Sequence, residues 1–278
     1  MVSESAQKKR VALVVQYLGT AFYGWQRQPH YRTVQEEIEK AINRTVSSSQ
    51  WIPLHGAGRT DSGVHAAAQV AHFDVISPIP AEKFAIVLNK QLGNDLLIRA
   101  SAQVASDWHA RFSASYRRYR YTLYTANPPN LFLAPFSWHY YYAPLNTASI
   151  EAALKPLLGY HDLAAFCRAG SERSHTWVEV QAVQCIRKGS IVEIEIQADG
   201  FLYGMVRLLV GMLVKVGTGE LSTEAFREIW QEKQRDRVKY SAPAKGLCLL
   251  RVGYEEFPFP ESIWFNSQPH FNLDATEE

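Results

Sequence analysis

The sequence predicts an α+β protein built from two halves with mostly antiparallel sheets. Apolar, β-branched runs such as Val11–Leu18 alternate with segments whose apolar residues recur at helical spacing. This alternation occurs in the first hundred residues and again in the remainder. The 278 residues suit two domains of ordinary size, and a hydrophobic content of 47% is enough for a core in each.

The first half, residues 1–105, is predicted to run β-α-β-α-β. Thr33 and Glu36 form a T-x-x-E capping box, so we expect a helix from residue 34 with Val34, Ile38 and Ile42 on its apolar face. A second helix follows Pro80. The predicted strands are Val11–Leu18, a short one near Trp51–Leu54, Gln69–Val75 and Leu96–Val104.

The second half, residues 106–254, repeats this mixture of elements. Helices are expected from Asn146 or Thr147 to Gly159, over Phe201–Val216 and after Ser222. The expected strands are Tyr116–Thr125, Ser137–Tyr142, Thr176–Arg187, Ile191–Gln197 and Leu247–Tyr254. Both halves fit a ferredoxin-like or RRM-like split βαβ order. Residues 255–278 form an acidic tail that contains Pro and Asn.

The charge is unevenly distributed. The tail carries six acidic residues and no Lys or Arg, and the rest of the chain holds 29 basic and 21 acidic residues, a net charge of +8. A basic body of this kind suits a polyanionic partner.

Cysteine spacing and hydropathy exclude several classes of protein. Cys167, Cys185 and Cys248 lie far apart without a CxxC pair, which argues against a disulfide framework and against a zinc ribbon. The most apolar stretch, Phe201–Val216, is interrupted by Arg207 and is shorter than the ~20 residues of a membrane span. We expect a cytoplasmic protein with no membrane segment and no metal.

The segment Gly56–Ala66 (GAGRTDSGVHA) is the first candidate for chemistry. Three glycines within eight residues predict a tight loop, and Arg59 and Asp61 lie in its middle. A guanidinium beside a carboxylate favours the ionised form, which can act as a nucleophile or a general base. Taken alone, the loop is also explained by an Arg–Asp pair that only stabilises a turn.

The segment Arg111–Tyr124 (RFSASYRRYRYTLY) interleaves arginines with aromatic residues. Strand alternation places Arg117, Tyr119 and Tyr121 on one face and Arg118 and Arg120 on the other. Such a strand suits stacking on bases and contact with phosphates. An ordinary edge strand with core tyrosines has the same pattern.

Two further segments are distinctive. In Asp199–Arg207, Arg207 is a cation within the otherwise apolar helix expected over Phe201–Val216, so it either pairs with a carboxylate or extends its charged end to solvent. Pro243–Leu247 is a turn that leads into the last strand.

Together these segments resemble the tRNA pseudouridine synthase A family over about Val11–Tyr254. Six motifs occur in the family's order: Tyr17–Gln26, GRTDSGVHA, Gln69–Phe73, Arg118–Tyr121, Gly200–Arg207 and Pro243–Leu247. The chain departs from the family at Leu18, where an acidic residue is common, and at Leu208, where asparagine is common.

The resemblance implies a pseudouridine-synthase fold with a central basic cleft. It also implies an isomerase that converts uridine to pseudouridine and needs no cofactor. Asp61 would be the nucleophile, and Arg59 and Arg207 would keep it anionic. Tyr119 would stack on the target base and assist proton removal, and Leu247 would pack on the other side of that base.

The implied substrate is the anticodon stem-loop of tRNA at positions 38, 39 and 40, bound by a homodimer. Arg27, Arg111 and Arg117 are candidates to hold its phosphates. A pseudouridine synthase for another RNA and a non-catalytic RNA-binding protein of the same fold are the alternatives. A carboxylate hydrolase is disfavoured because no second acidic motif accompanies Asp61.

Overall fold

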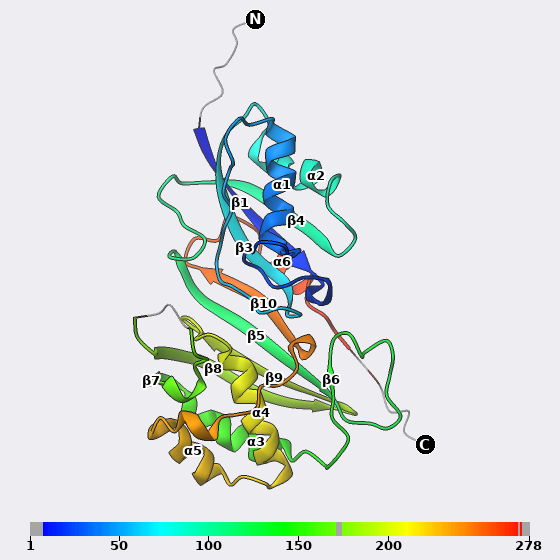
Figure 1. Ribbon diagram of the computed structural model, residues 1–278, viewed down its shortest axis with the longest axis vertical. Coiled ribbons are helices and arrows are strands. Elements are labelled where there is room, and N and C mark those ends of the chain that lie inside the picture. The colour runs from blue at the N-terminus through cyan, green and yellow to red at the C-terminus, as the bar shows by residue number, and fades with distance from the viewer. Residues whose placement is uncertain (1–7, 171–173, 272, 274–278) are drawn as a thin grey trace, which may run out of the picture. The chain divides into compact units, whose positions relative to one another are not determined.

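The computed structural model describes residues 8–170, 174–271 and 273. The chain divides into two compact units, Met1–Ser115 with Leu249–Pro269 (unit 1) and Tyr116–Cys248 with His270–Glu278 (unit 2). The first division therefore falls at residue 115, ten residues after the expected boundary, and the chain returns to unit 1 at Leu249. Each unit combines helices with a mainly antiparallel sheet, which confirms the α+β class (Figure 1).

The sheet of unit 1 is built around β1 (Lys8–Tyr17), which lies between β3 (His65–Ile76) and β4 (Leu96–Val104). Both pairings are antiparallel. The two-residue strand β2 (His55–Gly56) pairs with β3, and β10 (Leu247–Tyr254), most of which belongs to unit 1, lies beside β3 on the path of the sheet. The short strand expected near residues 51–54 thus occurs slightly later.

Helix α1 (Val34–Val46) begins at the expected residue, but not by the expected cap. The side chain of Thr33 makes no capping hydrogen bond, and its buried Oγ1 has no hydrogen-bond partner among the described residues. Instead, Val34 N donates to Gly24 O at 3.2 Å and Gln35 N donates to Trp25 O at 2.9 Å. Backbone carbonyls of the preceding loop therefore satisfy the first amides of the helix.

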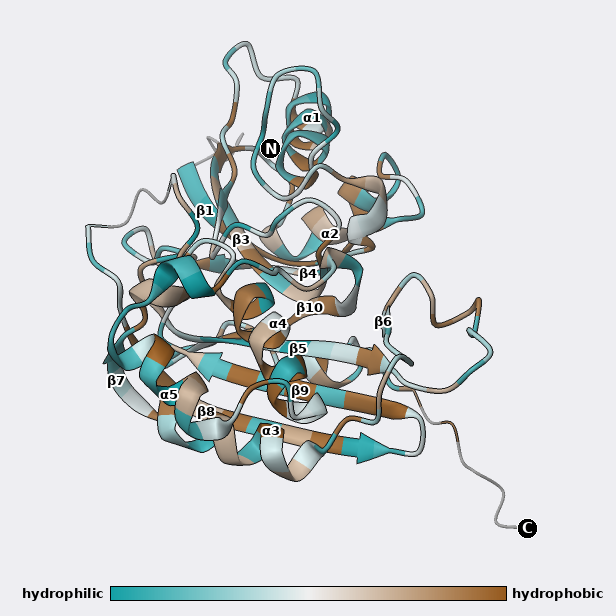
Figure 2. Cartoon of the chain, turned by 60° about the horizontal axis from the view of Figure 1, so that its bottom comes forward, coloured by the Kyte–Doolittle hydropathy of each residue, from teal (hydrophilic) through white to brown (hydrophobic). Residues whose placement is uncertain are grey.

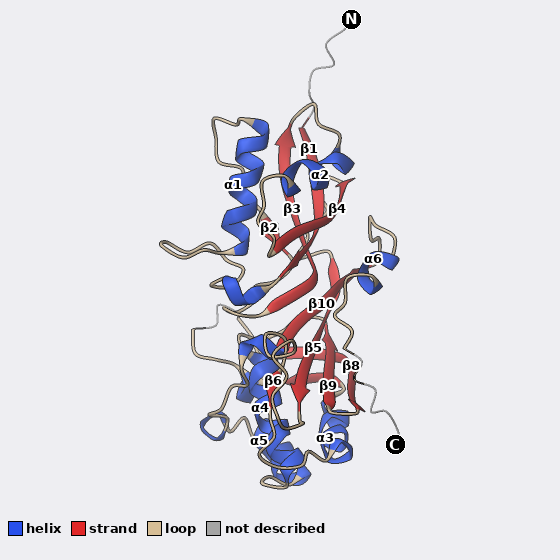
Figure 3. Cartoon of the chain, turned by 90° about the vertical axis from the view of Figure 1, so that its right-hand side faces the viewer, coloured by secondary structure: helices blue, strands red, loops and turns tan. Residues whose placement is uncertain are grey.

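The two faces of the unit 1 sheet are covered differently. Helix α1 lies on one side, with α2 (Phe84–Asn89) packed against β4, while α6 (Ser262–Phe265) lies on the other (Figure 3). Phe259 and Trp264 are buried there against Ala12 and Val14 of β1. The first part of the acidic tail is thus part of the core of unit 1, whereas residues 274–278 lie outside the described residues.

The sheet of unit 2 has the antiparallel order β5-β9-β8-β7. Its strands are β5 (Ala114–Tyr124), β9 (Ile191–Ala198), β8 (Trp177–Lys188) and β7 (Gly159–Asp162). The hairpin of β8 and β9 was expected almost to the residue. Only Trp138–His139 of the expected strand Ser137–Tyr142 forms β6, which pairs parallel to β5.

Helices α3 (Thr147–Leu154), α4 (Met205–Thr218) and α5 (Thr223–Gln231) lie on one face of this sheet (Figure 2). The expected helix over Phe201–Val216 starts later because Gly204 has φ +72°, and ends later because the left-handed residue is Gly219. Gly217 lies inside α4, where a Cβ would stand 2.9 Å from Ile150 Cδ1.

Candidate functional site

The loop from Ala57 to Val64 connects β2 to β3 and carries the two central charges of the first motif. Asp61 is half-buried, Arg59 is exposed, and Thr60 between them is buried. Val64 N donates to Asp61 O at 3.2 Å and closes the turn. At the start of the loop, Gln69 Nε2 donates to Gly58 O at 2.8 Å.

Both chain neighbours of Asp61 are held by a second segment that is distant in sequence. Trp25 N donates to Thr60 O at 3.1 Å on one side of Asp61. On the other side, Phe22 O accepts from Gly63 N and from Ser62 Oγ, both at 3.3 Å. These hydrogen bonds fix the backbone that carries the carboxylate, and such pre-organisation is required of a reacting group.

Side chains reinforce this connection. The buried hydroxyls of Tyr17 and Thr60 are 2.8 Å apart and share a hydrogen bond. Gly19, in the short 3-10 turn Gly19–Ala21, donates its N–H to Nδ1 of His65 at 3.1 Å. Because His65 Nδ1 accepts this bond, the imidazole is neutral and carries its proton on Nε2.

Two glycines make the close approach possible. Gly24 has φ +85°, and a Cβ there would lie 2.6 Å from Thr60 O and 3.2 Å from the carbonyl carbon of Asp61. A Cβ on Gly56 would lie 2.6 Å from the indole of Trp25. Only glycine fits at either position without displacement of the loop.

Unit 1 also contains two of the predicted phosphate-binding arginines. Arg27 donates through Nη1 to the buried carboxylate of Glu39 at 3.0 Å, and nearly half of its side chain stays exposed. The exposed Arg111 places its guanidinium carbon 5.7 Å from the ring centre of Phe112. Both side chains are therefore accessible for an external contact.

Unit 2 contains the remaining predicted site residues. Arg117 donates to Asp199 O at 2.8 Å. Tyr119 is 8% exposed, and its ring meets Phe201 edge-on at 4.9 Å. The structure thus brings the β5 residues together with the start of the Gly200–Arg207 motif.

Arg207 and Leu247 are connected through the turn before β10. The half-buried Arg207 donates through Nε to Ala242 O at 2.7 Å, and Ala242 N donates back to Arg207 O at 2.9 Å. Tyr121 donates its hydroxyl to Pro243 O at 2.8 Å. Leu247, 6% exposed, follows this turn. That Arg207 faces Asp61 stays a prediction.

The other face of β5 has a structural role. Arg118 and Arg120 both pair with Glu195, the latter through Nε at 2.7 Å, and Arg120 is only 7% exposed. Burial alone would raise the pKa of Glu195, but Arg120 and Arg118 outweigh it and hold that pKa below its ordinary value. These two arginines stabilise the sheet.

Sequence inspection missed a group of three histidines in unit 1. His72, almost fully buried, stacks on His55 at 5.1 Å and meets His109 at 4.5 Å. Burial, together with the positive charges of neighbouring groups, lowers the pKa of His72 to about 3. Its Nδ1 accepts from Ala110 N at 3.2 Å, so this imidazole is a neutral structural element. Among the described residues no group of side chains has the composition of a metal site.

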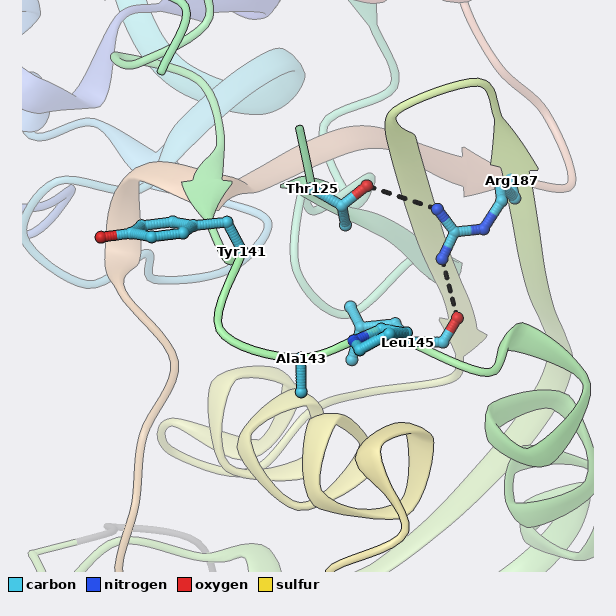
Figure 4. A pocket seen from close by; sticks show the side chains of 6 residues that line it. Thr125, Tyr141, Ala143, Leu145 and Arg187 are labelled. Carbon is cyan, nitrogen blue, oxygen red and sulfur yellow. Dashed lines mark hydrogen bonds between the residues drawn. The ribbon is translucent and has the colours of Figure 1, made fainter. Parts of the chain in front are cut away.

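A hollow of about 410 Å³ in unit 2 is distinct from these residues (Figure 4). Its lining includes Thr125, Leu145 and Arg187. Arg187 is already bound, since it donates to Thr125 Oγ1 at 3.3 Å and to Leu145 O at 2.8 Å. None of the predicted site residues lines this hollow, and its arginine is occupied by the protein itself.

Comparison with known proteins defines the class. A family model described as tRNA pseudouridine synthase matches residues 13–113 and 153–255. The chain belongs to this family, whose enzymes are isomerases. The matched segments include Asp61, Arg59, Arg207 and Leu247, whereas Arg117 and Tyr119 fall between them.

Individual relatives are similar over nearly the whole chain, and each is named tRNA pseudouridine synthase A. The relative from Rippkaea orientalis is 64% identical over 269 residues, which cover 97% of this chain and 91% of the relative. The relative from a Nostoc species is 65% identical over 95% of this chain and 93% of its own length. The relative from a Synechocystis species is 62% identical over 96% of this chain and 97% of its own length.

Within the described residues, no helix has the length and apolarity needed to cross a bilayer.

Proposed function

We propose that this protein converts uridine to pseudouridine in the anticodon stem-loop of tRNA, with Asp61 as the nucleophile. The observation that carries the proposal is the family match over the Asp61 loop, supported by the hydrogen bonds that hold the loop on both sides of Asp61. A carboxylate on a fixed backbone can meet a reacting carbon without a reorganisation cost.

The reaction is an isomerisation, so no group is gained or lost overall. The N1–C1′ bond breaks, the uracil turns, and C5 bonds to C1′. The C5 proton then leaves, and N1 ends protonated. Asp61 attacks C1′ or the uracil C6, or assists formation of a glycal, and all three routes need the carboxylate in its anionic form.

The other site residues have supporting roles in this proposal. Arg59 and Arg207 keep Asp61 ionised, because an opposite charge nearby favours the charged form. Tyr119 stacks on the target base and assists removal of the C5 proton, and Leu247 packs on the other face of that base. Together they retain the detached uracil while it rotates.

The proposed targets are tRNA positions 38, 39 and 40, and the proposed enzyme is a cytoplasmic homodimer. The target uridine has to leave its stack, which costs a few kcal/mol and least where pairing is weak. Phosphate contacts by Arg27, Arg111 and Arg117 offset this cost. The exposed side chains of Arg27 and Arg111 support this assignment.

Tritium release from tRNA labelled at uracil C5 tests the proposal. Wild type should release tritium, and Asp61→Asn should lose at least about 10⁴-fold in rate, the size expected when a nucleophile is removed, with tRNA binding nearly unchanged. Asp107→Asn, at an exposed aspartate of unit 1, is the matched control and should retain activity.

Substitution of the uridine at position 38, 39 or 40 by cytidine then locates the targets. Release that depends on none of these positions would indicate another site or another RNA. Strong residual release by Asp61→Asn would overturn the nucleophile assignment. Binding of tRNA without release by wild type would identify a non-catalytic binding protein.

A further inference from the structure

The loop between the 3-10 turn and α1 exposes large aromatic side chains in unit 1. Tyr23 is 54% exposed, Tyr31 is 47% exposed, and Trp51, which lies after α1, is 48% exposed. We call these three residues together with Arg27 the aromatic surface. Large rings left in contact with water indicate an interaction site when they gather in one place.

The first two rings form a pair. The ring centres of Tyr23 and Tyr31 are 4.4 Å apart. The backbone that carries Tyr23 is fixed, because Tyr23 N donates to Arg32 O at 2.9 Å and the Gln28 side chain donates through Nε2 to Tyr23 O at 3.0 Å. The pair is therefore a preformed feature of a folded loop.

The second pair, Arg27 and Trp51, is held by a buried carboxylate. Glu39 is fully buried and accepts from Arg27 Nη1 at 3.0 Å and from Trp51 Nε1 at 3.2 Å. The guanidinium carbon of Arg27 lies 5.4 Å from the ring centre of Trp51. Glu39 thus orients a cation and an indole side by side while both stay partly exposed.

The charge of the loop favours a nucleic acid as its partner. Residues 18–33 contain two arginines, one histidine and no acidic residue. Nucleobases stack on aromatic rings, and arginine binds the neighbouring phosphate. The exposed residues Leu131, Phe132 and Tyr142 of unit 2 offer a contrast, because residues 121–150 contain no Lys or Arg.

Residues next to Tyr23 in the chain bind the segment that carries the candidate nucleophile. Tyr23 lies between Phe22 and Trp25, whose backbone atoms bind Gly63 and Thr60 on the two sides of Asp61. The backbone that carries Tyr23 is therefore held against the segment that carries Asp61.

We propose that the aromatic surface stacks on unpaired bases that flank the uridine at Asp61. This inference rests on the proposed function. A uridine that leaves its stack exposes the faces of its neighbours, and the rings of Tyr23, Tyr31 and Trp51 replace the stacking that is lost. Arg27 holds the phosphate between these nucleotides.

The test measures tRNA binding with leucine variants, which keep apolar bulk and remove the π-face. Tyr23→Leu, Tyr31→Leu and Trp51→Leu are compared in an Asp61→Asn background, which separates binding from turnover. Each should raise the Kd for tRNA about 5- to 100-fold, the range expected for one lost base stack. Tyr23→Phe keeps the ring and should stay within about twofold of the parent.

Two controls make the result specific. Phe132→Leu removes an aromatic ring that is 89% exposed in unit 2 and should leave the Kd unchanged. The leucine variants should keep the parental salt dependence, whereas Arg27→Ala should lower the slope of log Kd against log salt by about one. Urea unfolding verifies that each variant is folded.

An unchanged Kd in all three leucine variants would overturn the proposal, as would an equal loss in Phe132→Leu. The outcome is separable from that of the proposed function. Should wild type release no tritium while Tyr23→Leu still weakens tRNA binding, the binding surface stands and the catalytic assignment fails.

Discussion

Strand β5 and the loop at residues 18–33 both combine arginines with aromatic residues, but they place these side chains in opposite environments. In β5, Tyr121 is fully buried and Arg120 is 7% exposed. In the loop, Tyr23 and Tyr31 are about half exposed, and Arg27 is 48% exposed in its side chain. The same residue types therefore build a core in one segment and an accessible surface in the other.

The difference arises from what surrounds each segment. β5 pairs with β9 along its length, and its Arg118 and Arg120 pair with carboxylates that β9 carries, Glu195 and, for Arg120, also Glu193. The loop binds the Asp61 segment through backbone atoms of Phe22 and Trp25, and it exposes the side chains of Tyr23, Tyr31 and Arg27. Composition alone predicts affinity for RNA in both segments, but within β5 the buried Arg120 and Tyr121 are committed to the fold.

The largest expected effect is on stability in β5. Arg120→Ala removes the most buried guanidinium of the cluster and leaves Glu195 with Arg118 and Glu193 with Lys188, so it should lower the free energy of unfolding by about 3 kcal/mol. Arg27→Ala should cost about 1 kcal/mol or less, because Glu39 keeps its bonds from Gln35, Trp51 and Leu54. Urea denaturation followed by tryptophan fluorescence compares the two. Equal losses of unfolding free energy in the two variants would contradict the distinction between a structural arginine in β5 and an accessible one in the loop.

Next in size is the loop's contact with Asp61. Gly24→Ala places a methyl group 2.6 Å from Thr60 O at a φ of +85°, so unfolding free energy should fall by about 2 kcal/mol or more, with a lower turnover rate. Gly58→Ala is the matched control, because a Cβ there would have no atom of the described residues within 4 Å. Thermal unfolding and tritium release report both quantities. A neutral Gly24→Ala would show that the loops are not tightly coupled.

A smaller effect separates the tyrosines. Tyr121→Phe removes the hydroxyl that donates to Pro243 O at 2.8 Å and should cost about 1 kcal/mol. Tyr23→Phe should leave stability unchanged within about 0.5 kcal/mol, since the residue is exposed. If Tyr23→Phe destabilised the fold as much as Tyr121→Phe, the loop tyrosine would be a core residue in effect.

The smallest expected effect is a difference in salt sensitivity. The hydrogen bond from Arg32 lowers the pKa of Asp95 beside the loop, and Arg120 and Arg118 lower that of Glu195 against its burial. Both lowered values stabilise the fold above the carboxyl's unfolded pKa, and this contribution is lost as pH falls through the folded pKa. Carboxyl NMR titration in high salt should raise the pKa of the more exposed Asp95 more than that of Glu195. Equal pKa shifts of Asp95 and Glu195 would argue that the ion pairs of Glu195 with the β5 arginines are no better shielded from salt than the Arg32–Asp95 pair.

Local patterns predicted much of the fold and the main candidate loop. The start of α1, the hairpin of β8 and β9 and the alternation along β5 depend on spacing between near neighbours, which the sequence displays directly. The glycine-rich loop around Asp61 was recognisable for the same reason. Its match to the family then defined the class of enzyme.

Local sequence patterns could not predict contacts between residues that are far apart in the sequence. Phe259 and Trp264 pack on β1 although they belong to an acidic, aperiodic tail. His55, His72 and His109 gather from three separate segments.

The sequence by itself determined the α+β class, the order of most elements and the identity of the Asp61 motif, because periodicity, turn residues and motif spacing are local properties. Only the tertiary structure decided that residues 22–25 hold the backbone around Asp61, that Arg120 is a buried partner of Glu195 and that Tyr23 and Tyr31 are exposed. Burial and hydrogen bonding depend on which distant segments meet, and that is set by the packing of the whole chain.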